Sequence, residues 1–503
     1  LPQIARDEIG AVTGVATAIA VLFIVIVALA GLGLAVVNAL AHNAWGTFTL
    51  AMTIPIALVM GLYLNHWRPG RVGEVSLIGV LLLLAAIVLG RPVAASAVGT
   101  WFDLGRESLI WWLAGYGFLA SVLPVWLLLA PRDYLSSFMK VGVVVLLAAG
   151  VVAMAPELQM PPTTAFVDGG GPIIPGTLFP FVFITIACGA ISGFHSLICS
   201  GTTPKMLDRE GHALVGYGAM LMESFVGVMA LIAASILIPG DYFAINTTLP
   251  AERLTAMGFP PVEVGELSQM VETNVQGRPG GAVSLAVGMA TIFASVPGLR
   301  GLIAYWYQFA LLFEALFILT TIDAGTRVAR YLIQDVAGAA HPRLGDLNWM
   351  PGAAAASALV VAAWGYLIAN GSISTIWPMF GAANQLLGTL ALCVGTTLLI
   401  KMGKARYLGV TAIPMVFVGT VTLTASWQLY GLFSARAAAA TTAKDAFNFR
   451  LDAALVAFVA VLAVIILADS ARQWYGYLVR KHPYRTTEVM GAEVYPMPTD
   501  PTL

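Results

Sequence analysis

Residues 186–205 read IACGAISGFHSLICSGTTPK, and they determine how the rest of the chain is interpreted. The stretch begins as an apolar membrane helix and then carries a histidine and a run of hydroxyl groups. Polar groups are costly in hydrocarbon, so inside a membrane they usually face a bundle interior, a cavity or a substrate path. The candidate path residues of this stretch are Ser192, Gly193, His195, Ser196, Ser200, Thr202, Thr203 and Lys205.

The spacing of the polar residues predicts one stripe on a helix. Steps of three, four or one separate Thr185, Cys188, Ser192, His195, Ser196 and Cys199. Gly189 and Gly193 form a pair of small residues that lets another helix approach closely. These glycines and the Gly-Thr-Thr-Pro at 201–204 favour unwinding of the helix. A polar stripe that leads into a broken helix is typical of transporters.

Composition places the chain in a membrane. Of its 503 residues, 59% are hydrophobic and only 10% are charged, whereas soluble domains have about 25% charged residues. The long apolar runs predict an all-α polytopic membrane protein, with the lipid bilayer as a partner. A net charge of −1 suggests no nucleic-acid partner. Three cysteines make no disulfide or metal-binding pattern, and we expect no cofactor.

Twelve segments are long enough to span a membrane, which takes about 20 residues. They lie near 14–41, 47–65, 73–90, 109–130, 138–155, 177–199, 212–239, 301–322, 353–370, 380–400, 407–433 and 451–469. A shorter thirteenth segment, 282–297, lies between glycine and proline turn signals. Residues 1–472 are therefore predicted to form a transmembrane transporter domain, and residues 473–503 a cytoplasmic tail.

Charge bias predicts the orientation of the chain. The basic loops near Arg68, Arg132 and Lys205 alternate with loops that lack arginine and lysine, so the basic ones are expected in the cytoplasm. The acidic 240–280 loop is then external and long enough to form a small lid. Later basic loops stay cytoplasmic only if 282–297 is re-entrant, with Arg278 and Arg300 on the same side. A full crossing is the alternative.

Other polar residues lie within apolar segments: Glu314, Thr321, Asp323, Asn384 and Gln385. Glu314 and Thr321 are seven residues apart and share a helical face. Asp323 is either the partner of Arg327 in an end-of-helix salt bridge or a member of the path. The two amides serve either hydrogen bonds between helices or the substrate. His195 and Glu314 are the candidate carriers of a coupling proton.

Three blocks of the sequence resemble a known family. They are SGFHSLICSGTTPKM at 192–206, FEALFILTTIDAGTRVAR at 313–330 and WPMFGAANQLLGTLALCVGTTLLIKMGK at 377–404, which are similar to the carbon starvation protein A (CstA) family. The resemblance implies a multi-pass protein of the prokaryotic cytoplasmic membrane, grouped with the amino acid–polyamine–organocation transporters. It also implies a LeuT-type inverted-repeat core with broken helices. Family members carry an upstream Gly-Pro-Gly-rich broken helix, so we expect the natural protein to begin further upstream.

The resemblance and the residues together predict a transporter and no enzyme, with no catalytic residues. The expected activity is proton-coupled import of pyruvate or short peptides, a stress response to carbon starvation. A monocarboxylate needs one anion site, such as a helix N-terminus or Lys205. A zwitterionic peptide also needs an acidic partner, and Glu314 is the candidate. A membrane nutrient sensor that signals through a partner is the alternative function.

Overall fold

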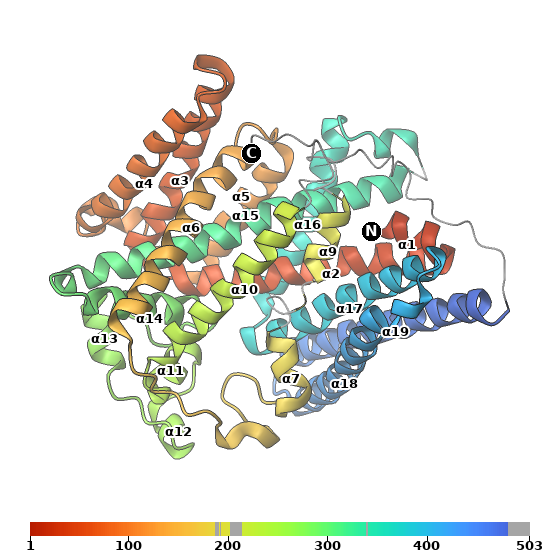
Figure 1. The fold of residues 1–503 in the computed structure, drawn as a ribbon. Coiled ribbons are helices and arrows are strands. Elements are labelled where there is room, and N and C mark those ends of the chain that lie inside the picture. The colour runs from red at the N-terminus through yellow and green to blue at the C-terminus, as the bar shows by residue number, and fades with distance from the viewer. Residues whose placement is uncertain (187–190, 192, 202–213, 339–340, 481–503) are drawn as a thin grey trace, which may run out of the picture. The chain divides into compact units, whose positions relative to one another are not determined.

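The computed structural model describes residues 1–186, 191, 193–201, 214–338 and 341–480. This part of the chain is α-helical and contains no strand (Figure 1). Ten of its helices are long and apolar enough to cross a membrane. The prediction of an all-α polytopic membrane protein is therefore confirmed.

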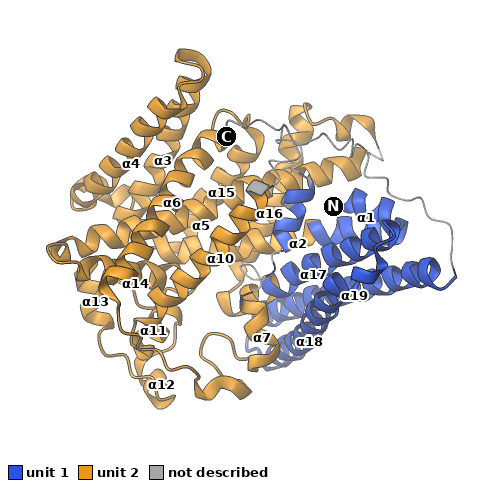
Figure 2. Cartoon of the chain, viewed as in Figure 1, with its two compact units in different colours: residues 1–21, 186–207, 381–503 blue, residues 22–185, 208–380 orange. Residues whose placement is uncertain are grey.

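The chain divides into two compact units, which Figure 2 colours separately. Unit 1 comprises residues 1–21, 186–207 and 381–503, and unit 2 comprises residues 22–185 and 208–380. Two long helices contribute to both units, α2 (Ala11–Leu40) and α17 (Ile373–Lys401).

Unit 1 consists of the start of α2, most of α17, and α1 (Pro2–Glu8), α9 (Gly193–Gly201), α18 (Gly409–Ala439) and α19 (Ala443–Leu478). Helices α18 and α19 pack against each other along their lengths. Polar contacts link distant segments: Lys401 pairs with Glu8 at 3.0 Å, and the Trp474 indole donates to the Thr397 hydroxyl at 2.8 Å. Helix α19 continues past residue 472, where a tail was expected to begin.

Unit 2 holds the remaining helices. The long ones are α3 (Ala44–Leu62), α4 (Val72–Ala94), α5 (Arg106–Val122), α6 (Leu129–Met154), α10 (Leu214–Ser235), α15 (Ile303–Gly338) and α16 (Met350–Asn370). The shorter ones are α7 (Leu178–Thr185), α11 (Pro239–Asn246), α12 (Ala251–Ala256), α13 (Val264–Met270) and α14 (Ala282–Ser295). Helix α15 is central to the unit, because it packs on α3, α5, α6, α14 and α16.

The predicted crossing at 109–130 is corrected by the structure. Helix α5 ends at Val122, and its 17 residues span about 25 Å, which is short of the ~30 Å hydrocarbon core. Leu123 is extended because it precedes Pro124, whose ring disfavours helical geometry at the residue before it. The chain re-enters a helix only at Leu129, where α6 begins.

The predicted crossing at 177–199 is also corrected. Helix α7 ends at Thr185 and α9 begins at Gly193, so the polar stripe is not carried by one continuous helix. Of the stripe, Thr185 ends α7, and His195, Ser196 and Cys199 lie on α9, whereas Cys188 and Ser192 lie outside the described residues. Unwinding was predicted both at the glycines of this stretch and at 201–204, and α9 does begin at Gly193. Residues 202–204 lie outside the described residues.

The predicted loop at 240–280 is folded rather than extended. It contains three short helices, and Asp241 of α11 links to the start of α13, because its carboxylate accepts the backbone N–H groups of Val262, Glu263 and Val264 at 2.8 to 3.0 Å. Arg278 donates to the carbonyl of Ala39 at 3.0 Å, which satisfies the end of α2. This packing gives the compact body expected of a lid, while its external location stays a prediction.

Helix α14, the predicted re-entrant segment, is 14 residues long and spans about 21 Å. Gly281 before it and Gly298 after it have positive φ angles, as turns require. We expect cysteines introduced at the exposed positions Gln276 and Arg300 to react with an impermeant thiol reagent in intact cells, and one at Lys404 not to react. Labelling at 276 with protection at 300 would show a full crossing instead.

Candidate functional site

The candidate residues of unit 1 meet where α9 packs on α17. The backbone N–H of Phe194, at the start of α9, donates to the Asn384 side-chain oxygen at 2.8 Å. A Cβ atom on Gly193 would overlap backbone atoms of Asn384 and Gly388. The close helix approach predicted at Gly193 is therefore confirmed. It exists because α9 starts at a glycine and α17 supplies an amide that satisfies an otherwise free N–H group.

The hydroxyl groups on α9 are bound within their own helix. Ser196 donates to the carbonyl of Gly193 at 2.6 Å, and Ser200 donates to the carbonyl of Leu197 at 3.2 Å. His195 is exposed. The predicted path residues Ser192, Thr202, Thr203 and Lys205 lie outside the described residues. A role of this group in a substrate path stays a prediction.

The two amides of α17 are buried, Asn384 fully and Gln385 almost fully. The Gln385 side-chain oxygen accepts from the Thr422 hydroxyl of α18 at 3.4 Å. Asn384 uses its oxygen for α9, while its side-chain nitrogen has no hydrogen-bond partner among the described residues. Both amides therefore hydrogen-bond between helices, which was one of the two roles predicted for them.

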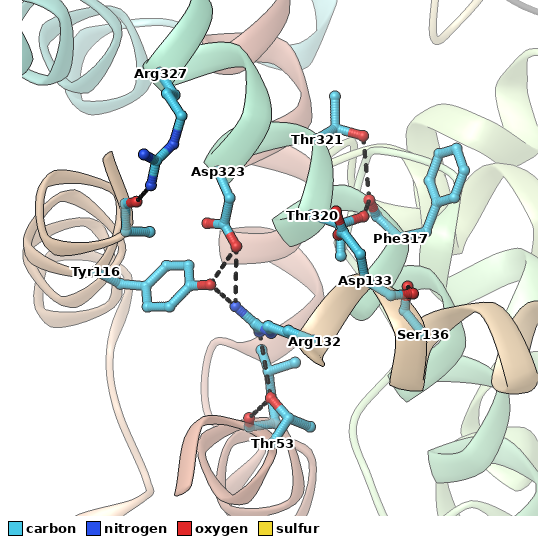
Figure 3. A network of polar contacts seen from close by, with 12 residues as sticks. Thr53, Tyr116, Arg132, Asp133, Ser136, Phe317, Thr320, Thr321, Asp323 and Arg327 are labelled. Carbon is cyan, nitrogen blue, oxygen red and sulfur yellow. Dashed lines mark hydrogen bonds and ion pairs between the residues drawn. The ribbon is translucent and has the colours of Figure 1, made fainter. Parts of the chain in front are cut away.

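Glu314 and Thr321 lie on α15 in unit 2. Glu314 is half-buried, and the structure gives its carboxylate no hydrogen bond or ion pair within the described residues. Thr321 donates its hydroxyl to the carbonyl of Phe317 one turn earlier, at 3.2 Å (Figure 3). The structure shows no hydrogen bond between the side chains of Glu314 and Thr321, although both lie on α15.

Asp323 belongs to a buried polar network that the sequence did not predict. Its carboxylate accepts the hydroxyl of Tyr116 from α5 and lies 3.5 Å from the guanidinium of Arg132 from α6. The same guanidinium donates to the Tyr116 hydroxyl and stands over its ring, 4.6 Å from the centroid. Figure 3 shows the three side chains pointing toward one another. Arg132 and Asp323 are both fully buried.

Two atoms of this network are left without partners. Among the described residues, neither the Arg132 Nε nor the Asp323 Oδ1 makes a hydrogen bond, although both atoms are buried. Arg132 reaches one further group, the Thr53 hydroxyl of α3 at 3.3 Å. A buried ion pair needs excellent geometry to offset the loss of water. This pair therefore keeps unmet hydrogen-bonding capacity on both of its members.

The predicted pairing of Asp323 with Arg327 is wrong. Arg327 turns to the end of α5 instead, where it donates to the carbonyls of Ala120 and Leu123. Arg330 donates to the neighbouring carbonyl of Ser121 at 2.7 Å. The end of α5 competes successfully for these arginines because its last carbonyls have no helical donors.

A cavity of about 230 Å³ borders the network. Its lining is apolar except for Thr47 and the polar ends of Tyr116 and Arg132. The remaining residues are Val36, Val37, Leu40, Leu50, Ala51, Ile54, Trp101, Phe102, Leu104, Leu109, Trp112, Leu113 and Leu319. Along α5 the lining runs from Leu109 to Tyr116, which is about 10 Å of helical rise, and Leu104 lies just before this helix. The cavity thus connects the α4–α5 turn with the polar network.

Arg132 and Tyr116 were missed as site residues for specific reasons. Arg132 lies beside Pro131 and Asp133, so it resembled a charge in a cytoplasmic loop. Tyr116 lies in an apolar segment and carries no charge that would mark it as a site residue. Their contact with Asp323 joins residues more than 190 positions apart, and one sequence does not reveal such a pairing.

Comparison with known proteins gives a consistent result. The model of the family described as "Carbon starvation protein CstA" matches residues 1–425. The peptide transporter CstA of Campylobacter jejuni is 50% identical over 446 residues, which cover 84% of this chain and 63% of that protein. The pyruvate/proton symporter BtsT of Escherichia coli is 44% identical over 460 residues, which cover 83% and 64%.

The peptide transporter CstA of Mycobacterium tuberculosis is 50% identical over 455 residues, 85% of this chain and 60% of that protein. The chain thus spans about 60 to 63% of the length of these two CstA relatives. No solved structure matches it significantly. The family match, which covers most of the chain, and the high identity to several relatives show that this protein belongs to the carbon starvation protein CstA family.

Proposed function

We propose that this protein is a secondary active transporter that imports a small organic nutrient across the prokaryotic cytoplasmic membrane. The nutrient is pyruvate or a short peptide, the driving force is a proton gradient, and the need arises when carbon is scarce. The observation that carries the proposal is the likeness to relatives named as peptide transporters and as a pyruvate/proton symporter. A LeuT-type core with broken helices remains a prediction from the resemblance.

The buried charges of unit 2 support this proposal. Ionisable side chains inside a membrane bundle are expensive and usually mark a substrate, ion or proton pathway. Asp323 and Arg132 lie in helices long and apolar enough to span the bilayer, and neither is exposed. The cavity beside them provides space for a solute.

Uptake into vesicles tests the proposal. The full-length protein is reconstituted, a pH gradient that is acidic outside is imposed, and radiolabelled pyruvate and alanyl-alanine are offered separately. Accumulation of either solute above its external concentration supports transport, and a protonophore must abolish it. Saturable binding without accumulation would indicate the sensor instead. A chemically altered solute would indicate an enzyme.

Proton coupling predicts a characteristic variant. Replacing the residue that carries the proton with an amide should abolish uphill accumulation but spare exchange of labelled for unlabelled solute. His195→Gln and Glu314→Gln test the two residues that the sequence proposed. Exchange without a gradient is the internal control, since it shows that the variant is folded. If both variants accumulate solute normally, neither residue is the carrier.

A further inference from the structure

The cavity in unit 2 ends at the only charge in its lining. Among the lining residues that the structure describes, Arg132 alone is ionised at neutral pH, and Tyr116 offers a phenol beside it. Pockets for drug-sized ligands measure about 300–1,000 Å³, so a cavity of about 230 Å³ fits a smaller solute. Apolar walls with one cation at the end suit a small molecule with one carboxylate and one apolar end.

The same lining disfavours a zwitterionic peptide. A peptide brings an ammonium group as well as a carboxylate, and the ammonium needs an acidic or carbonyl partner after it leaves water. The described lining contains no aspartate or glutamate. Asp323 lies behind Arg132 and Tyr116, where it already accepts the Tyr116 hydroxyl.

We propose that Arg132 and Tyr116 form the binding site for the carboxylate of a small monocarboxylate, and that Asp323 is the proton acceptor that competes with this carboxylate for Arg132. The inference rests on the proposed transport function and names its site. Without solute, Asp323 is the anion that faces the Arg132 guanidinium, at 3.5 Å. The bound carboxylate takes this place, and the unpartnered Arg132 Nε provides a further donor.

Charge explains how this exchange couples the solute to a proton. A solute carboxylate beside Asp323 places two anions on one guanidinium, and such a pair favours protonation of one of them. Binding is reciprocal, so a proton on Asp323 must tighten binding of the carboxylate by the same factor. The solute anion and the proton therefore enter the site together.

The other charges around Asp323 leave this coupling in place. Asp133 and Lys140 lie on α6, and Glu314, Arg327 and Arg330 lie on α15 itself. Arg327 and Arg330 are held by carbonyls of α5, and Lys140 stands over the Phe317 ring. Helices α3, α14 and α16 and the unit 2 part of α2 contain no acidic or basic residue. Arg132 is the one described cation that forms an ion pair with Asp323.

Uptake and exchange of radiolabelled pyruvate by the reconstituted full-length protein test the proton acceptor. Asp323→Asn is expected to lose pH-driven accumulation but to keep exchange within about twofold of the wild type. Its affinity for pyruvate should not vary with pH, whereas wild-type affinity should rise by up to about tenfold per pH unit of acidification. Asp133→Asn is the matched control, because it removes a neighbouring carboxylate that does not touch Arg132.

Two further variants test the carboxylate site. Arg132→Lys keeps the charge and loses the planar fork, so pyruvate should bind about tenfold or more weakly. Tyr116→Phe keeps the ring and should weaken pyruvate binding by about five- to tenfold.

A thermal-shift assay guards against misfolding. Pyruvate should raise the unfolding temperature of Asp323→Asn more than that of the wild type, because it supplies the anion that Arg132 has lost.

The results separate this inference from the proposed function. If the wild type accumulates pyruvate and Asp323→Asn does so equally well, the inference is overturned and transport stands. If the wild type accumulates alanyl-alanine but not pyruvate, the inference is likewise overturned and transport stands. If the wild type accumulates neither solute, but pyruvate stabilises Asp323→Asn selectively, the carboxylate site stands and transport falls. Equal stabilisation of the wild type and Asp323→Asn contradicts the site.

Discussion

Gly193→Ala is expected to separate α9 from α17 and to lower the free energy of unfolding by about 3 kcal/mol. A Cβ atom at this position would overlap the Asn384 carbonyl oxygen, the Leu387 Cβ and the Gly388 nitrogen. Two of these atoms belong to the backbone of α17, so no rotation of a side chain relieves the overlap. The hydrogen bond from the Phe194 N–H to Asn384 would be lost together with the contact.

The measurement is the unfolding temperature of the purified variant, together with its uptake of solute. Gly431→Ala is the matched control, because Gly431 also lies in a helix of unit 1 and has open space where a Cβ atom would be. Alanine normally stabilises a helix by roughly 0.5–1 kcal/mol relative to glycine, so the control should be neutral or more stable. The two substitutions thus have opposite expected signs. A Gly193→Ala protein as stable as the control would show that α9 does not depend on this contact.

The sequence predicted the membrane class and most spanning helices because hydrophobic length is a local property. A run of about 20 apolar residues is visible without knowledge of its neighbours. Ten of the twelve predicted crossings, such as 301–322 in α15, correspond to long apolar helices. The two failures, 109–130 and 177–199, are segments where the helix stops inside an apolar run.

The positions of these helix breaks depend on partners as well as on local sequence. Pro124 was a visible signal, and α5 does end just before it. At the second break the glycines were the visible signal, and α9 begins at Gly193. There the free N–H of Phe194 is satisfied by Asn384, a residue 190 positions away. A helix that begins inside a membrane needs partners for its first N–H groups, and a partner from a distant segment is a tertiary feature.

The candidate site was only partly predicted, because the pairing of its residues is also a tertiary feature. Asp323 was visible as a carboxylate in an apolar helix, and one of its two predicted roles, the pairing with Arg327, rested on the four-residue spacing. That rule describes helices in isolation. In the folded protein the Arg327 guanidinium finds the free carbonyls of α5, and Asp323 finds Arg132. Intramembrane polar residues are therefore identifiable from sequence, while their pairing is not.

Arg327→Ala is the second substitution with a large expected effect, because Arg327 completes the end of α5. The carbonyl of Ala120 would normally accept from the N–H of residue 124, but Pro124 has none. Arg327 donates to this carbonyl and to that of Leu123, the latter at 2.7 Å. Removal of the guanidinium leaves both groups without donors, at about 1–3 kcal/mol each. We expect a loss of about 2–6 kcal/mol in the free energy of unfolding.

Thermal unfolding of three variants separates this role from a general effect of losing a positive charge. Arg343→Ala removes an exposed arginine and should change stability by no more than about 0.5 kcal/mol. Arg327→Lys retains the charge but presents one ammonium group in place of a planar fork, so it should recover only part of the loss. If lysine restores full stability, the charge matters and the two carbonyl contacts do not. If alanine is as stable as the Arg343 control, the end of α5 is satisfied without Arg327, and Arg330 at the Ser121 carbonyl is then the arginine that holds it.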